Sequence, residues 1–68
     1  MQILEKAHCL LKEINREILL EEESMKSILQ KYSSEILSAL IDLKGYESDI
    51  VGKEYISKLS IYRQIINI

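Results

Sequence analysis

The chain has 68 residues, of which 47% are hydrophobic and 29% are charged, and its formal net charge at pH 7 is −2. This length allows one domain, and the hydrophobic content excludes a chain that stays disordered for lack of apolar residues. A single cysteine excludes an intramolecular disulfide, and one cysteine with one histidine supplies too few of the usual ligands for a zinc site. No metal or other cofactor is therefore expected.

Acidic residues are concentrated near the start, where residues 1–23 contain six glutamates against two lysines and one arginine. This distribution does not favour binding to nucleic acid, whose phosphates attract clustered basic residues. No apolar run reaches the roughly 20 residues needed to cross a bilayer, and no charged and apolar leader is recognisable. We therefore expect no membrane partner, and an intracellular, cytoplasmic location.

An apolar stripe with helical spacing begins at Ile3 and keeps its phase as far as Leu43. It predicts one long helix over about residues 2–44, which would measure about 65 Å at 1.5 Å per residue. In the early half the stripe is narrow and has the spacing of a coiled coil. In the later half it widens to include Leu37 and Ile41, as expected of a helix that also contacts another chain.

A break at residues 21–24 is the alternative, because Ser24 could cap a new helix and so produce a three-helix bundle. Against a break, this segment contains no glycine, proline, asparagine or aspartate. The apolar stripe also keeps its phase from Ile18 to Met25, which an inserted loop would normally disturb. We predict a continuous helix and retain the three-helix bundle as its competitor.

The clearest stop is at Gly45, for which we expect the left-handed backbone conformation that closes many helices. The turn covers residues 45–48, and Ser48 or Asp49 caps a second helix over about residues 49–67. Gly52 lies in the first turn of this helix, where the missing side chain allows another backbone to approach closely.

The second helix would be only about 28 Å long and is apolar on more than half of its circumference, including Ile50, Val51 and Ile61. It can cover only the later half of the first helix, which leaves the early half without a partner in its own chain. The predicted fold is a single all-α domain over residues 1–68, a helical hairpin that assembles into an oligomeric coiled coil or helical bundle. The partner is either a second copy or a larger helical protein. The candidate interface residues are Leu4, Ala7, Leu11, Ile14, Ile18, Met25, Leu29, Tyr32, Ile36, Leu59, Tyr62 and Ile66.

The residues that could carry chemistry do not form a recognisable site. His8 and Cys9 are adjacent, so on a helix they point about 100° apart and cannot share one ligand site. The glutamate run at 21–23 is typical of a solvated surface, and Tyr55 and Tyr62 are expected to pack with their hydroxyl groups at the rim of the core. No phosphate-binding loop or nucleophile constellation is present, so neither an enzyme nor a small-molecule ligand is predicted.

The sequence therefore favours a non-enzymatic interaction or structural subunit, such as a scaffold, an adaptor, a small chaperone or a minor subunit of a larger complex. The alternative is a small DNA-binding regulator of the helix-turn-helix type, dimerised by its N-terminal helix, with Gly45 in the turn. Its recognition helix would offer bases little beyond Lys53, Ser57 and Lys58, and Ile41 is large for its position in that motif.

Overall fold

The computed structural model describes residues 2–20 and 22–67, and all of the regular structure in these ranges is helical. The chain forms α1 (Ile3–Leu20), α2 (Met25–Lys31), α3 (Ser33–Asp42), the short 3-10 helix η1 (Leu43–Tyr46) and α4 (Ile50–Ile66). The all-α prediction is confirmed. The described residues form four α-helices, a number that differs both from the predicted hairpin and from its three-helix alternative.

The long helix predicted over residues 2–44 is wrong, because α1 ends at Leu20 and α2 begins at Met25. Ser24 has an extended backbone conformation, and its hydroxyl oxygen accepts a hydrogen bond from the Ser27 backbone N–H at 3.2 Å. This is the N-cap that the alternative required. Glu21 lies outside the described residues.

The apolar stripe keeps its helical phase from Ile18 to Met25, and this continuity led to the wrong prediction of one long helix. When the chain reverses, each helix needs only to turn its own apolar side toward the core, and no angular relation between the two stripes is required. Folding back also hides the apolar side of α1 within its own chain, which contributes about 1.5–3 kcal/mol for each large side chain that becomes fully buried.

A second interruption separates α2 from α3 at Tyr32, whose backbone angles are φ −103° and ψ 9°. The Tyr32 N–H donates to the carbonyl of Leu29 at 3.0 Å, and the Ile36 N–H donates to the carbonyl of Tyr32 at 2.8 Å. The chain thus closes one helix with a tight turn and begins the next at the same residue. Because of this bend, α2 and α3 each contact both α1 and α4.

The connection to α4 differs from the prediction at one glycine and agrees with it at the other. Gly45 lies inside η1 and has no positive φ, so the expected left-handed closure at this residue is wrong. Asp49 caps α4, since one carboxylate oxygen accepts hydrogen bonds from the Val51 N–H at 2.9 Å and the Gly52 N–H at 3.1 Å. Gly52 is buried, and a Cβ added to it would collide with Tyr46, which confirms the predicted close approach.

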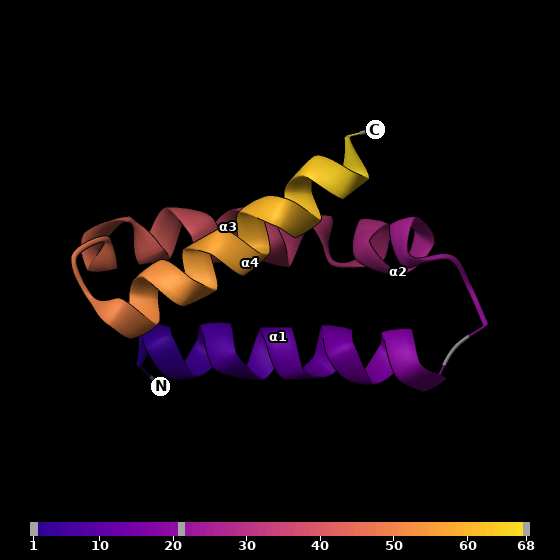
Figure 1. Ribbon diagram of the computed structural model, residues 1–68, viewed down its shortest axis with the longest axis horizontal. Helices are drawn as coiled ribbons and strands as arrows, with labels where there is room; N and C mark the ends of the chain where they lie inside the picture. Colours follow the sequence, from indigo (N-terminus) through magenta and orange to yellow (C-terminus); the bar gives the residue numbers. More distant parts are fainter. Residues whose placement is uncertain (1, 21, 68) are drawn as a thin grey trace.

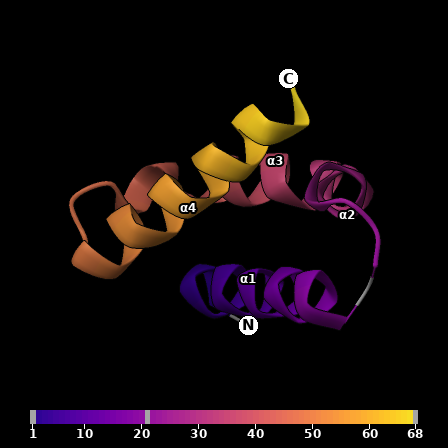
Figure 2. The ribbon, with the colours of Figure 1, turned by 45° about the vertical axis from the view of Figure 1, so that its right-hand side comes forward.

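Figures 1 and 2 show α1 along one side of the molecule, with α2, α3 and α4 together on the other. The segment formed by α2 and α3 runs back along α1, and α4 then runs in the same direction as α1 (Figure 1). Two contacts between tyrosine hydroxyls and α1 confirm this parallel arrangement, since Tyr55 meets His8 and Tyr62 meets Asn15, each at a separation of 47 residues.

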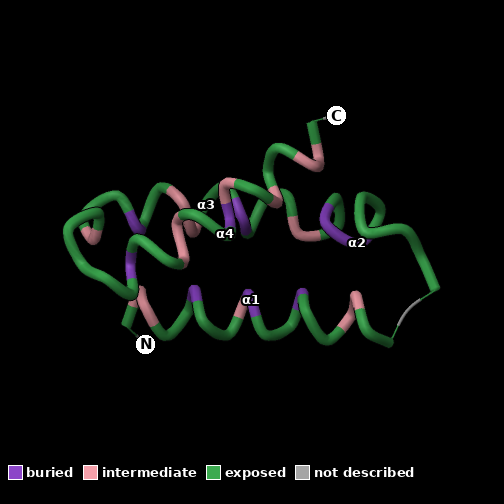
Figure 3. Tube along the Cα trace, viewed as in Figure 1, coloured by how far each residue is buried: buried purple, intermediate pink, exposed green. Residues whose placement is uncertain are grey.

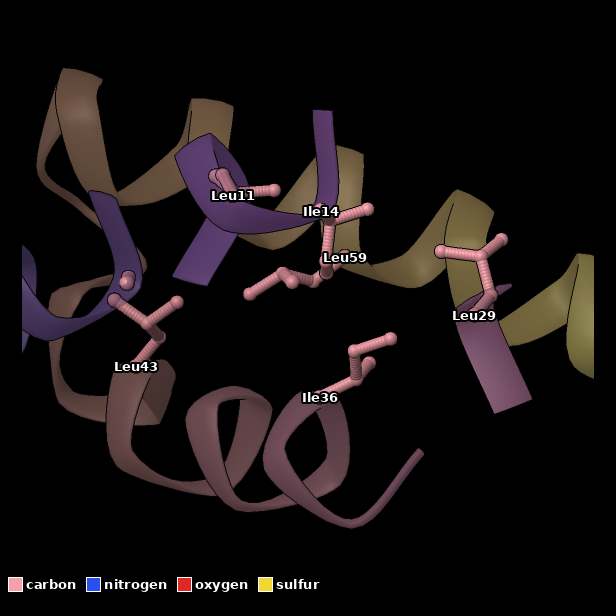
Figure 4. Packing of buried hydrophobic residues seen from close by; sticks show 7 residues of the cluster. Leu11, Ile14, Leu29, Ile36, Leu43 and Leu59 are labelled. Carbon is pink, nitrogen blue, oxygen red and sulfur yellow. The ribbon is translucent and has the colours of Figure 1, made fainter. Parts of the chain in front are cut away.

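Every helix contributes buried residues, and those of α1 lie on the side that faces the other helices (Figure 3). Figure 4 shows Leu11 and Ile14 of α1 facing Ile36 of α3 and Leu59 of α4. The core cluster consists of Ala7, Leu11, Ile14, Leu29, Ile36, Leu43 and Leu59. The radius of gyration is 11.6 Å, close to the roughly 11 Å expected for a folded domain of this length. The early half of the predicted stripe therefore finds its partner within its own chain.

Candidate interaction surface

Most of the predicted interface residues line the core of the chain itself. Six are buried, namely Ala7, Leu11, Ile14, Leu29, Ile36 and Leu59. Five more are half-buried, namely Leu4, Ile18, Tyr32, Tyr62 and Ile66, and Met25 is exposed. Because these side chains are largely occupied within the domain, a surface for a partner must be sought among other residues.

Large hydrophobic side chains remain exposed after the chain has closed its core. They are Leu19, Leu20, Met25, Leu37, Ile41, Ile50, Val51 and Ile61. Leu37 and Ile41 are four residues apart and so share one side of α3, where Ile41 is 64% exposed. Ile50 and Ile61 are separated by three helical turns and share the outer side of α4, with exposures of 85% and 55%. We call these four residues the outer apolar residues.

The sequence carried a signal for the outer apolar residues. The widening of the stripe at Leu37 and Ile41 predicted a second contact surface, and both residues are exposed here. The large apolar arc of the second helix also indicated burial on several sides, yet Ile50 and Ile61 remain mostly exposed. The packing of the described residues thus leaves these side chains largely exposed to solvent.

A cleft of about 470 Å³ separates α1 from α3 on another side of the domain. We call it the α1–α3 groove. Small side chains open it, in particular Ser34, Ser38 and Ala39 of α3 opposite Ala7 of α1. Apolar groups of Ile3, Ala7, Leu10 and Ala39 form part of the lining, together with the charged residues Lys6, Glu13, Glu35 and Asp42.

Carboxylates gather around Tyr32, beyond one end of this groove. Burial raises the pKa of the Tyr32 hydroxyl above its ordinary value, and a hydrogen bond to the Glu17 carboxylate raises it further. The negative charges of Glu17, Glu13 and Glu35 act in the same direction, because a tyrosinate would be repelled by them. Within the described residues, Glu17 Oε2 is buried and has no hydrogen-bond partner.

A second hollow of about 430 Å³ lies beside α1 and α4 and is lined by Leu4, Glu5, His8, Cys9 and Tyr55. The Tyr55 hydroxyl lies 3.3 Å from His8 Nδ1, and the two rings are tilted by 41°. Tyr62 donates from its hydroxyl to the Asn15 side-chain oxygen at 3.3 Å. Both hydroxyls therefore lie at the rim of the core as predicted, and they join α4 to α1.

The structure places the proposed recognition helix of the DNA-binding alternative in α4, where Gly52 and Leu59 face the core. The basic residues of this helix are Lys53, Lys58 and Arg63. Each is five residues from the next, so successive side chains are rotated by about 140° and do not share one side.

Comparison with protein-family models, with characterised proteins and with solved structures finds no match to this chain. None of the helices within residues 2–20 and 22–67 is long and apolar enough to cross a membrane. The same ranges contain no group of three or more histidine, cysteine, aspartate or glutamate residues placed to hold a metal ion.

Proposed function

We propose that this protein is a small, non-enzymatic interaction module that binds another protein through the surface of its α3–α4 half. The observation that carries the proposal is the exposure of large hydrophobic side chains in a chain that already has a closed core. Binding of a partner that removes these exposed apolar groups from water lowers the free energy of the system.

The outer apolar residues are suited to this role by their position. Ile41 and Ile50 lie on either side of η1, where α3 passes into α4. Leu37 extends the apolar surface along α3, and Ile61 extends it along α4. A helix or a loop of a partner that covers this half of the domain would therefore find apolar contacts on both helices.

Site-specific photo-crosslinking in the cells that make the protein tests the proposal. A photoreactive phenylalanine analogue is placed at Ile41 or Ile61 in separate variants, and at the exposed residue Lys12 of α1 as a matched control. We expect a discrete protein adduct from the first two positions and none from the third. No adduct at any position, or the same adducts at all three, would contradict the proposal.

Light scattering of the purified chain distinguishes the two kinds of partner. Self-association gives a mass above the 7.9 kDa of one chain, and the variant Ile61→Asp should return it to that value. A monomer at all concentrations indicates a different protein as the partner. Because Ile61 is exposed, the aspartate should leave the helical circular dichroism and the thermal midpoint nearly unchanged.

A further inference from the structure

We propose that the α1–α3 groove binds a basic amphipathic helix of another protein, with an arginine or lysine of that helix beside Glu13 and Glu35. This inference rests on the proposed function as an interaction module and specifies the chemistry of one partner. Its grounds are the shape of the groove and the sign of the charges along it.

The groove has the form that a helix-borne side chain can enter. Ser34 and Ser38 are one turn apart on α3, and their small side chains leave open space facing α1. Leu10 and Ala39 are half-buried in the lining, so they provide apolar contact without closing the space. Leucine or alanine side chains of a partner helix would be removed from water there.

The two ends of the groove differ in charge. Because α1 and α3 run in opposite directions, the start of α1 lies beside the end of α3 (Figure 1). This direction places Lys6 and Asp42 toward one end, where their charges offset each other. Glu13 and Glu35 lie toward the other end and have the same sign. Within the described residues neither carboxylate forms an ion pair, so this end attracts a cation from outside the chain.

Glu17 lies one helical turn beyond Glu13 on the same side of α1, outside the groove lining, and its negative charge adds to that of this end. The guanidinium group of arginine carries five N–H donors, enough to serve more than one carboxylate, and lysine supplies a compact positive charge. A partner with a basic residue at this end would therefore match the negative charge of Glu13 and Glu35 and donate hydrogen bonds to their carboxylates.

A second copy of this chain is a poorer occupant than a basic helix. Its net charge is −2, and the basic residues of its α4 are distributed around that helix instead of along one side. The groove requires a partner helix whose positive side chains are aligned beside its apolar stripe. The proposal is accordingly for a different protein.

The test uses a fluorescein-labelled amphipathic peptide of about 18 residues, long enough for five helical turns. Its apolar side consists of leucine and alanine, and its flank carries arginine. A second peptide has glutamate at each arginine position. Fluorescence anisotropy should show that the full-length protein binds the arginine peptide, that binding weakens between about 50 and 300 mM salt, and that the glutamate peptide does not bind.

Two variants then locate the site. The double variant Glu13→Gln, Glu35→Gln should weaken binding at least about fivefold. The matched pair Glu22→Gln, Glu47→Gln, whose residues are also exposed but lie outside the groove lining, should not weaken it. Ser38→Phe should fill the groove and abolish binding, and circular dichroism checks that it folds. Equal weakening by both glutamine pairs, or full binding by the Ser38→Phe protein, would overturn the proposal.

Failure of this proposal is distinguishable from failure of the proposed function. If the photoreactive analogue at Ile61 captures a partner while the Ser38→Phe variant still captures it at the same level, the partner occupies the outer side of α3 and α4 and the groove is not its site. If the peptide binds but the mass in solution shows that the peptide only dissociates a dimer of the chain, a second copy occupies the groove and the proposal is wrong.

Discussion

Replacing Gly52 by alanine tests the closest backbone approach in the fold. An added Cβ would lie 2.8 Å from the Tyr46 Cβ and closer still to the Tyr46 carbonyl oxygen. The oxygen belongs to the backbone and cannot rotate away, so α4 or η1 must shift. Overpacking of this kind costs about 1–3 kcal/mol. Alanine offsets up to about 1 kcal/mol of that cost through its higher helix propensity. We expect a net loss of about 1–2 kcal/mol in the free energy of unfolding.

Urea unfolding followed by circular dichroism measures this loss, and thermal unfolding should show a midpoint lower by about 4–8 °C for each kcal/mol. Gly45→Ala is the matched control, because a Cβ there meets no atom within 4 Å and the residue has no positive φ. That variant should be neutral or more stable by about 0.4–1 kcal/mol. If Gly52→Ala proves as stable as the parent protein, the packing of Tyr46 on the start of α4 is wrong.

Three further predictions concern the core, a helix cap and the dependence on pH. Ile14 is fully buried, so Ile14→Ala should lower the free energy of unfolding by about 2–5 kcal/mol, and an unchanged urea midpoint would remove it from the core. Asp49→Ala removes the acceptor for two backbone N–H groups of α4, and should cost about 1 kcal/mol by the same measurement, whereas Asp49→Asn should retain most of the stability. The pKa of Tyr32 is higher in the folded than in the unfolded chain, so its contribution to stability is complete below the unfolded pKa and is lost as the pH rises through the folded value. Stability should therefore fall above about pH 10, and Tyr32→Phe should reduce that fall; identical alkaline profiles of the two proteins would contradict the assignment.

Local patterns in the sequence were sufficient for several features of the fold. The apolar spacing predicted helices throughout, and α4 begins and ends within one residue of the predicted bounds of 49 and 67. Asp49 was one of two candidate caps, and Gly52 was expected to admit a neighbouring backbone. Each of these depends on residues within a few positions along the chain, where side-chain type alone constrains the backbone.

The interface was harder to predict, because apolar spacing shows that one side of a helix is buried but does not identify the surface that covers it. Leu11 and Ile14 have the same pattern whether they face another chain or α3 and α4 of their own. The α1–α3 groove left no signal in the periodicity, since it arises from small residues on two helices that only the fold brings together. Its clue in the sequence is the pair Ser34 and Ser38, one turn apart beside a glutamate.

The sequence by itself determined that this protein is helical, that one helix ends before Gly45 and that another begins at Asp49. Propensity, periodicity and capping act over one or two helical turns, so they can be recognised in the sequence. Only the tertiary structure decided that the chain reverses after Leu20 and bends at Tyr32. Those two changes of direction depend on the free energy of burying α1 against α2, α3 and α4, which is a property of surfaces far apart in the sequence. The same packing determined which apolar side chains are left facing the solvent.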